Sequence, residues 1–176
     1  HGIDAVVNAV GVLRNSRRQP MQAIHADAPC ALFDACAQAG VRRVVQISAL
    51  GIADGDTPYA STKKVADAHV LRLTQAGALD GTVVRPSIVF GPGAQGTELF
   101  VTLSRLPLLV LPRQAIEAQV QPLAACDLGD AVAALLGEEA ARQHGGRIVH
   151  LAGARPLPLA AFIASLRVQA GKNAPH

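Results

Sequence analysis

Apolar, β-branched runs alternate with segments of helical character along the whole sequence. Near-continuous apolar runs suit strands that are buried on both faces, as in a parallel sheet. Alternation of such strands with helices favours helices packed on a mostly parallel sheet. We therefore predict an α/β fold with strands at 3–10, 44–48, 82–90, 118–121 and 147–151, and helices at 27–38, 59–75, 99–106, 127–142 and 159–169.

Residues with special backbone preferences mark the ends of these elements. Gly40 and Gly77 follow two of the helices, and glycine accepts the left-handed conformation that ends a helix. Asp127 and Asp130 can cap the helix that they open, because their carboxylates accept N–H groups of the first turn. Pro86 has no N–H to donate within a sheet, so it marks a bulge or a strand end.

The size of the chain favours one folding unit. It has 176 residues, of which 50% are hydrophobic and 16% are charged. This length is enough for one domain with a substantial core and is short for two. No repeat, low-complexity segment or linker interrupts the sequence. We therefore expect residues 1–176 to form a single domain.

Composition argues against several functions. The formal net charge is only +3, and no aromatic residues stand among the clustered arginines to stack on bases, so no nucleic-acid binding is expected. The six histidines and three cysteines show no common metal-ligand spacing, so no metal site is expected. The odd number of cysteines indicates reduced thiols in a cytoplasmic protein. The longest apolar stretch, 99–112, is broken by Ser104, Arg105 and Pro107, so we expect no membrane span.

Tyr59 and Lys63 form the pair best suited to chemistry. Side chains four residues apart on a helix share one face, so the phenol and the ammonium would project together. A free phenol has a pKa of about 10, and a neighbouring ammonium lowers that pKa by favouring the phenolate. Such a tyrosine can donate and accept protons near neutral pH. The competing interpretation is a tyrosine packed at a helix start beside an exposed lysine.

Three motifs include or flank this pair, namely VVQISALG at 44–51, YASTK at 59–63 and VRPSIVFGPG at 84–93. Together they resemble the short-chain dehydrogenase/reductase superfamily, in its atypical or extended branch of NAD-dependent epimerase/dehydratase-like proteins. They are also similar to the nucleotide-binding accessory subunit of respiratory complex I. The resemblance covers nearly the whole chain and implies a Rossmann-like, doubly wound, mostly parallel sheet that binds NAD or NADP.

The resemblance implies a role for each matching residue. Tyr59 would be the catalytic proton donor and acceptor. Lys63 would bind the nicotinamide ribose and lower the pKa of Tyr59. Ser48, at the end of a predicted strand, would be the third catalytic residue and hydrogen-bond the substrate oxygen. The cofactor-binding residues would be Asn8, Ala9, Val10 and Gly11 beneath the adenosine, Tyr59 and Lys63 at the ribose, and Pro86, Ser87 and Ile88 flanking the nicotinamide.

A literal GxGxxG match stands at 91–96, after a predicted strand. Pro92 removes one of the backbone N–H groups that such a loop directs at a pyrophosphate. The match is better interpreted as the family's substrate-side loop, which puts the substrate-side portion within about 91–176. We expect the true glycine-rich loop to precede His1, so that the domain is partial at its N-terminus. The residue that selects NAD or NADP would also precede His1.

The leading hypothesis is an NAD(P)-dependent oxidoreductase or epimerase-like enzyme acting on a carbonyl or alcohol carbon of a small molecule. The alternative is a non-catalytic NAD(P)-binding protein that uses its cofactor for structure or assembly. A count along the strand that puts the family's serine at Ala49 favours this alternative, as does the short interval between Ser48 and Tyr59. A nucleotide-sugar epimerase or dehydratase would share the fold. His25 is the one histidine near the predicted ligand end, and a structural role is favoured for it. The sequence leaves the substrate and the oligomeric state open.

Overall fold

The structure is a computed structural model that describes residues 2–91, 95–106, 110 and 113–169. The chain divides into two compact units. The first consists of His1–Pro86 and Asp130–Leu151, and the second of Ser87–Gly129 and Ala152–His176. No helix within the described ranges combines the length and the apolar character needed to cross a bilayer.

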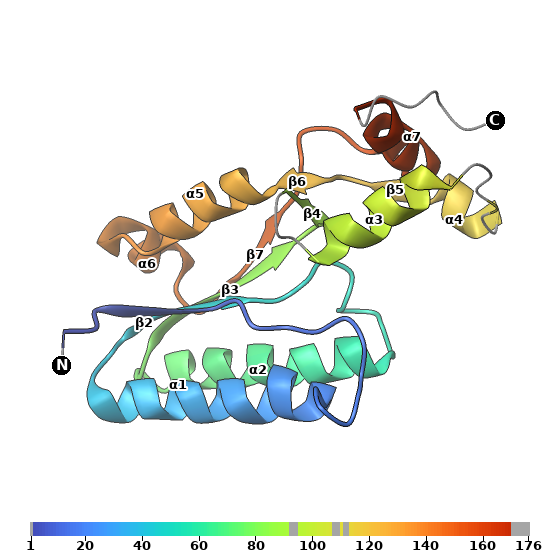
Figure 1. The fold of residues 1–176 in the computed structure, drawn as a ribbon. Helices are drawn as coiled ribbons and strands as arrows, with labels where there is room; N and C mark the ends of the chain where they lie inside the picture. Colours follow the sequence, from blue (N-terminus) through green and yellow to red (C-terminus); the bar gives the residue numbers. More distant parts are fainter. Residues whose placement is uncertain (1, 92–94, 107–109, 111–112, 170–176) are drawn as a thin grey trace. The chain divides into compact units, whose positions relative to one another are not determined.

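A four-stranded sheet forms the centre of the first unit (Figure 1). Its strands lie in the order β1-β2-β3-β7, and each neighbouring pair is parallel, which confirms the predicted mostly parallel sheet. Because the strands run in one direction, their carboxyl ends meet at one edge, where open parallel sheets bind ligands. The strands are β1 (Ala5–Asn8), β2 (Arg43–Ile47), β3 (Asp80–Pro86) and β7 (Ile148–Leu151).

Helices α1 (Ala28–Ala39) and α2 (Pro58–Gln75) lie side by side along one face of this sheet (Figure 1). Phe33 of α1 and Val70 of α2 are fully buried in the core between the layers, together with Val44 of β2. Burying each side chain of this size contributes roughly 1.5–3 kcal/mol relative to leaving it exposed. The apolar seam therefore holds α2 against the strands whose carboxyl ends it must face.

The ends of α1 and α2 follow from local chemistry. The Thr57 side chain accepts a hydrogen bond from the Ala60 amide, so it caps the first turn of α2. Gly40 ends α1 with a φ of 74°, a left-handed conformation that glycine adopts without strain. A short π-helix, η1 (Ala23–Asp27), precedes α1 where the sequence predicted only a helix start.

The helix predicted at 127–142 is two helices in the structure, α5 (Ala125–Leu135) and α6 (Glu138–His144). Asp127 lies inside the first turn of α5, which begins at Ala125, so its role as a cap stays a prediction. Asp130 lies further along α5, so its prediction as a cap is wrong. The break falls at Gly137, which is the N-cap of α6, because glycine is a poor helix former in mid-helix.

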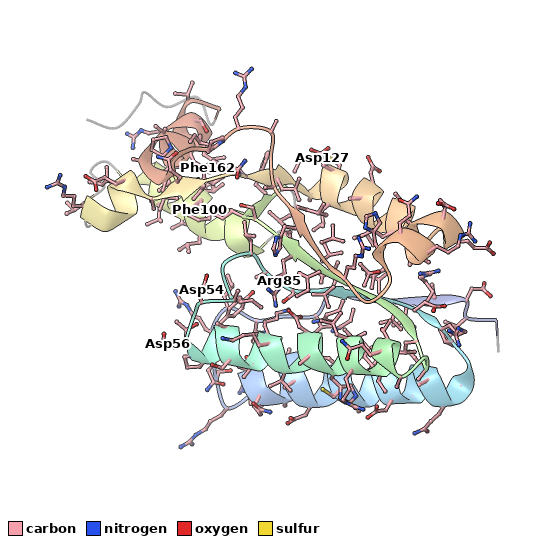
Figure 2. All side chains as sticks on the ribbon, turned by 180° about the vertical axis from the view of Figure 1, so that it is seen from behind. Asp54, Asp56, Arg85, Phe100, Asp127 and Phe162 are labelled. Atoms are coloured by element: carbon pink, nitrogen blue, oxygen red, sulfur yellow. The ribbon has the colours of Figure 1, made fainter. Side chains whose placement is uncertain are left out.

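The second unit contains short strands, and the predicted strand at 82–90 is divided between the two units. Strand β3 ends at Pro86, and the next strand begins only at Val89. Phe162 packs edge-on against Phe90, with ring centroids 6.2 Å apart. It packs edge-on against Phe100 as well, at 5.4 Å, and Figure 2 labels both of these residues. The elements are β4 (Val89–Phe90) parallel to β6 (Leu123–Ala124), β5 (Gln119–Val120) antiparallel to β8 (Leu157–Pro158), and helices α3 (Gln95–Arg105), α4 (Arg113–Glu117) and α7 (Leu159–Gln169).

Candidate active site

Four buried polar side chains line the α2 side of the sheet at its carboxyl end. Side chains two residues apart on a strand share one face, so Gln46 and Ser48 lie on the same face as the core residue Val44. The register pairs Asn8 with Gln46. Gln46 in turn pairs with Val83, which puts Arg85 on this face as well. The strand pattern therefore directs amide, hydroxyl and guanidinium groups at helix α2.

Lys63 approaches this edge from α2. Its ammonium donates hydrogen bonds to the carbonyl oxygens of Val10 and Ile47, each at 3.2 Å. These carbonyls stand just beyond β1 and at the end of β2, so Lys63 ties the helix to the ends of two strands. An ammonium has three N–H donors, which leaves one for a ligand. Burial lowers the pKa of Lys63, and the negative charge of Asp67 opposes that change.

Tyr59 lies one helical turn before Lys63 and is half-buried. Burial raises the pKa of Tyr59, and the negative charge of Asp67 raises it further. The prediction that Lys63 lowers the Tyr59 pKa is therefore wrong in direction for this structure. The physical reason is that burial, and after it the nearby Asp67 carboxylate, penalise the phenolate.

Ser48 belongs to a buried ion-pair network. Its hydroxyl donates to Asp67 Oδ2 at 2.9 Å. The same oxygen accepts hydrogen bonds from Arg85 Nε at 3.1 Å and Arg85 Nη2 at 2.9 Å. Figure 2 shows Arg85 extending from the sheet towards the helices. Because the only hydroxyl hydrogen of Ser48 is used by Asp67, donation to a substrate oxygen would require this bond to break. The catalytic role of Ser48 stays a prediction.

Asp67 is the site residue that sequence reasoning missed. It is 2% exposed, and burial raises its pKa while the hydrogen bonds from Arg85 and Ser48 oppose the rise. Its other oxygen, Oδ1, is buried and has no hydrogen-bond partner among the described residues, and the same holds for Nε2 of Gln46. The available signal was spacing, because Asp67 follows Lys63 by four residues and so shares the helix face of Tyr59 and Lys63.

His25 connects the π-helix to two other parts of the site. It is 1% exposed, and its Nε2 accepts a hydrogen bond from the Val12 amide at 2.9 Å. Its Nδ1 lies 3.0 Å from Thr62 Oγ1, on the turn of α2 between Tyr59 and Lys63. The imidazole meets the Tyr59 ring edge-on, with centroids 5.2 Å apart. Burial lowers the pKa of His25, and the positive charge of Lys63 lowers it further.

The residues after β1 that were predicted to bind a cofactor differ in exposure. Asn8 is buried, and its Nδ2 donates to Gln46 Oε1 at 2.6 Å, so its side chain is occupied within the sheet. Ala9, Val10 and Gly11 are exposed. A Cβ on Gly11 would lie 3.3 Å from Lys63 Nζ, so glycine leaves room beside the ammonium.

The remaining predicted residues lie after the ends of β2 and β3. The Pro86 carbonyl at the end of β3 accepts a hydrogen bond from the Leu50 amide at 2.8 Å. Ser87 and Ile88 begin the second unit, and their cofactor role stays a prediction. Residues 92–94 of the GxGxxG match lie outside the described residues. Within the described part of the chain, no group of three or more His, Cys, Asp or Glu side chains is arranged to hold a metal ion.

Comparison with known protein families identifies a match over most of the chain. The model of the NAD dependent epimerase/dehydratase family matches residues 1–149. No curated protein sequence matches the chain. These results do not bear on the predicted similarity to the accessory subunit of respiratory complex I, which stays a prediction.

Solved structures share the fold. A double mutant of the dTDP-glucose 4,6-dehydratase DesIV from Streptomyces venezuelae, with NAD bound, has a TM-score of 0.75 at 22% sequence identity, over 98% of this chain and 59% of that one. The UDP-glucuronic acid 4-epimerase from Bacillus cereus, in complex with NAD, has a TM-score of 0.80 at 18% identity, over 99% of this chain and 62% of that one. The chain thus spans about three fifths of the length of these proteins.

Proposed function

The chain belongs to the NAD dependent epimerase/dehydratase family, and from this premise we propose that it is part of an enzyme that uses NAD to oxidise an alcohol carbon of a nucleotide sugar. The observation that carries the proposal is the placement of Tyr59 and Lys63 on one face of α2, with Lys63 anchored at the carboxyl ends of β1 and β2. The substrate class is suggested by the names of the two structural neighbours, a dTDP-glucose 4,6-dehydratase and a UDP-glucuronic acid 4-epimerase.

The residues at this edge fit a nicotinamide nucleotide. The exposed residues Ala9–Gly11 include the Val10 carbonyl that binds the Lys63 ammonium, and the missing side chain of Gly11 leaves room beside that ammonium. The spare Lys63 N–H and the Tyr59 hydroxyl would hold ribose hydroxyls, which both donate and accept hydrogen bonds. When bound, NAD supplies the acceptor for hydride from the substrate carbon.

Tyr59 would move the proton in this reaction. Its Oη would accept the proton of the substrate hydroxyl while the C–H bond of that carbon breaks, and it would return the proton when the carbonyl is reduced. Because the pKa of Tyr59 is raised, its phenolate is a stronger base. For the same reason a smaller fraction of Tyr59 is ionised near neutral pH. Lys63 would orient the ribose and provide the positive charge nearest the reacting groups. The substrate side would come from a portion of the chain within about 91–176.

A non-catalytic NAD-binding protein is the second candidate. The Ser48–Asp67 bond favours it, because this bond occupies the hydroxyl expected to bind substrate and the next residue, Ala49, has none to offer. In that case NAD would bind and stay oxidised with every sugar offered. The two candidate functions therefore both predict NAD binding, but only the enzyme predicts turnover of a nucleotide sugar.

Tyr59→Phe tests the proposal, because it removes Oη and keeps the ring that contacts His25. Loss of a general acid–base lowers the rate roughly 10²–10⁴-fold. The protein as encoded by its gene is incubated with NAD and a panel of UDP- and dTDP-hexoses, and products are analysed by mass spectrometry and NMR. Ser61→Ala, an exposed position on the same turn, is the matched control and should keep full activity. Unchanged turnover in Tyr59→Phe refutes the catalytic role.

A further inference from the structure

We propose that His25 is a positioning residue that connects the loop after β1 to helix α2, and that it performs this role only as the neutral imidazole protonated at Nδ1. The proposal rests on the proposed function in one respect, since it takes the loop after β1 as the segment that approaches NAD. The contacts of His25 themselves stand on the structure alone.

The tautomer follows from the partners. A backbone amide can only donate, so Nε2 of His25 must accept from the Val12 N–H and carries no hydrogen. The hydrogen of a neutral imidazole then sits on Nδ1, which donates to Thr62 Oγ1. Thr62 Oγ1 donates in turn to the Pro58 carbonyl at 2.8 Å, in the first turn of α2. One chain of hydrogen bonds thus runs from the loop through His25 into α2.

A second connection runs parallel to the first. Lys63 Nζ donates to the Val10 carbonyl, two residues before the amide that His25 holds. Gly11 lies between the two anchors, and a Cβ there would be 3.3 Å from Lys63 Nζ and 3.7 Å from His25 Nε2. The loop is therefore fixed on α2 at Val10 and again at Val12, which determines where the exposed residues of the loop would meet a ligand.

His25 also supports Tyr59 directly. The imidazole is edge-on to the phenol ring, at an interplanar angle of 87°, and Thr62 lies between Tyr59 and Lys63 on α2. Loss of the imidazole would free both the loop and the ring that carries the reacting hydroxyl. A π-helical turn often marks a functional position, and η1 places this residue where a regular helix start was expected.

Protonation disconnects the loop. A hydrogen on Nε2 would oppose the Val12 N–H and turn an acceptor into a donor. The groups that face His25 are Lys63 and Tyr59 on α2, with Val12 and Thr62 uncharged, and no carboxylate contributes to its pKa within the described residues. Because the pKa of His25 is lowered in the folded protein, the loop connection is complete above the unfolded value of about 6.5 and is lost as pH falls through the folded value.

Two variants separate the anchors. In His25→Gln the amide oxygen reaches the position of Nε2 and can accept from Val12, whereas in His25→Asn the shorter side chain reaches only the position of Nδ1. His69→Gln is the control, because it removes a histidine that pairs with Asp34 away from the site. NADH affinity is measured by fluorescence as a function of pH in the protein as encoded by its gene.

We expect the NADH affinity of the wild-type protein to weaken in acid. The NADH affinity of His25→Gln should not depend on pH. His25→Asn should bind NADH roughly fivefold to tenfold more weakly than the wild type at neutral pH, because it loses one hydrogen bond. Equal binding by the Gln and Asn variants overturns the proposal. Imidazole ¹⁵N NMR of wild-type protein without NADH gives an independent test, since a hydrogen on Nε2 at neutral pH refutes it even where a variant fails to fold. If these tests fail while Tyr59→Phe abolishes turnover, the proposed function stands and the role of His25 falls.

Discussion

Replacing Asp67 with leucine would leave the Arg85 guanidinium buried without a counter-charge. The pair has side-chain exposures of 3% for Asp67 and 10% for Arg85, so solvent compensates little. Removing one partner of a buried ion pair costs about 3–5 kcal/mol. For a protein of this size 1 kcal/mol shifts Tm by roughly 2–4 °C, so Asp67→Leu should lower Tm by about 6–20 °C. Arg85→Met should cost a similar amount, because it leaves the carboxylate buried and unpaired.

The double variant tests whether the charges depend on each other. Asp67→Leu combined with Arg85→Met removes both charges, and apolar replacements of buried pairs are often neutral or stabilising. The remaining cost is the Ser48 hydroxyl, which loses its acceptor, at about 1–3 kcal/mol. Adding Ser48→Ala should recover most of that cost. The single effects should sum to about 6–10 kcal/mol, and the double variant should cost about 1–3 kcal/mol. The sum of the single effects should therefore exceed the effect of the double variant by about 3–9 kcal/mol.

Urea unfolding followed by circular dichroism measures these changes, provided that the transition is two-state. Glu139→Gln is the control, because its ion pair with Arg142 lies on the exposed surface of α6 and should not contribute measurably. If both single variants unfold at the wild-type urea concentration, the buried pair does not exist in solution. If the double variant equals the sum of the singles, the residues do not interact.

Three further predictions concern binding, packing and pH. Lys63→Met should weaken NADH binding roughly tenfold to a hundredfold through loss of charged hydrogen bonds, and Lys64→Met, one residue further on, should not; equal affinity of both variants contradicts the anchor role. Gly81→Ala should destabilise the fold by about 1–3 kcal/mol, because a Cβ there would lie 2.7 Å from side-chain atoms of α2. The control Gly129→Ala adds a Cβ in open space on α5 and should stabilise the fold by up to about 1 kcal/mol in the same urea assay. A Gly81→Ala variant more stable than Gly129→Ala would contradict this packing argument. Because burial raises the pKa of Tyr59, the oxidation rate should climb with pH towards an alkaline limb above about 10; a plateau near neutral pH in steady-state kinetics contradicts this.

The parallel sheet could be predicted because its signal is local and repeated. Each strand of the first unit is a β-branched run between helical segments, and parallel strands need such crossovers. The spacing of Tyr59 and Lys63 predicted their shared helix face for the same reason. The order in which the strands pair, and the face of α2 that packs on them, then follow from where apolar side chains can be buried.

The contacts inside the site could not be predicted from local pattern. Ser48 and Asp67 are nineteen residues apart and meet only because α2 packs across the end of β2. The direction of the Tyr59 pKa depends on that meeting, since Asp67 and burial oppose the phenolate. The π-helix around His25 carries no periodic signal in the sequence. The break between α5 and α6, in contrast, had a local signal in Gly137 that the prediction of one helix over 127–142 passed over.

The most direct test of the account is single-turnover oxidation of a nucleotide sugar by NAD-loaded protein, with nicotinamide absorbance followed in wild type and in Tyr59→Phe. The account predicts that wild type reduces its bound NAD with at least one sugar of the panel. It predicts that Tyr59→Phe binds NAD at most about tenfold more weakly, as the loss of one hydrogen bond to the ribose would cause. When saturated with NAD, this variant should reduce it roughly 10²–10⁴-fold more slowly. Equal rates in the two proteins would contradict proton transfer by Tyr59. Tight NAD binding with no reduction by any sugar would favour a non-catalytic NAD-binding protein.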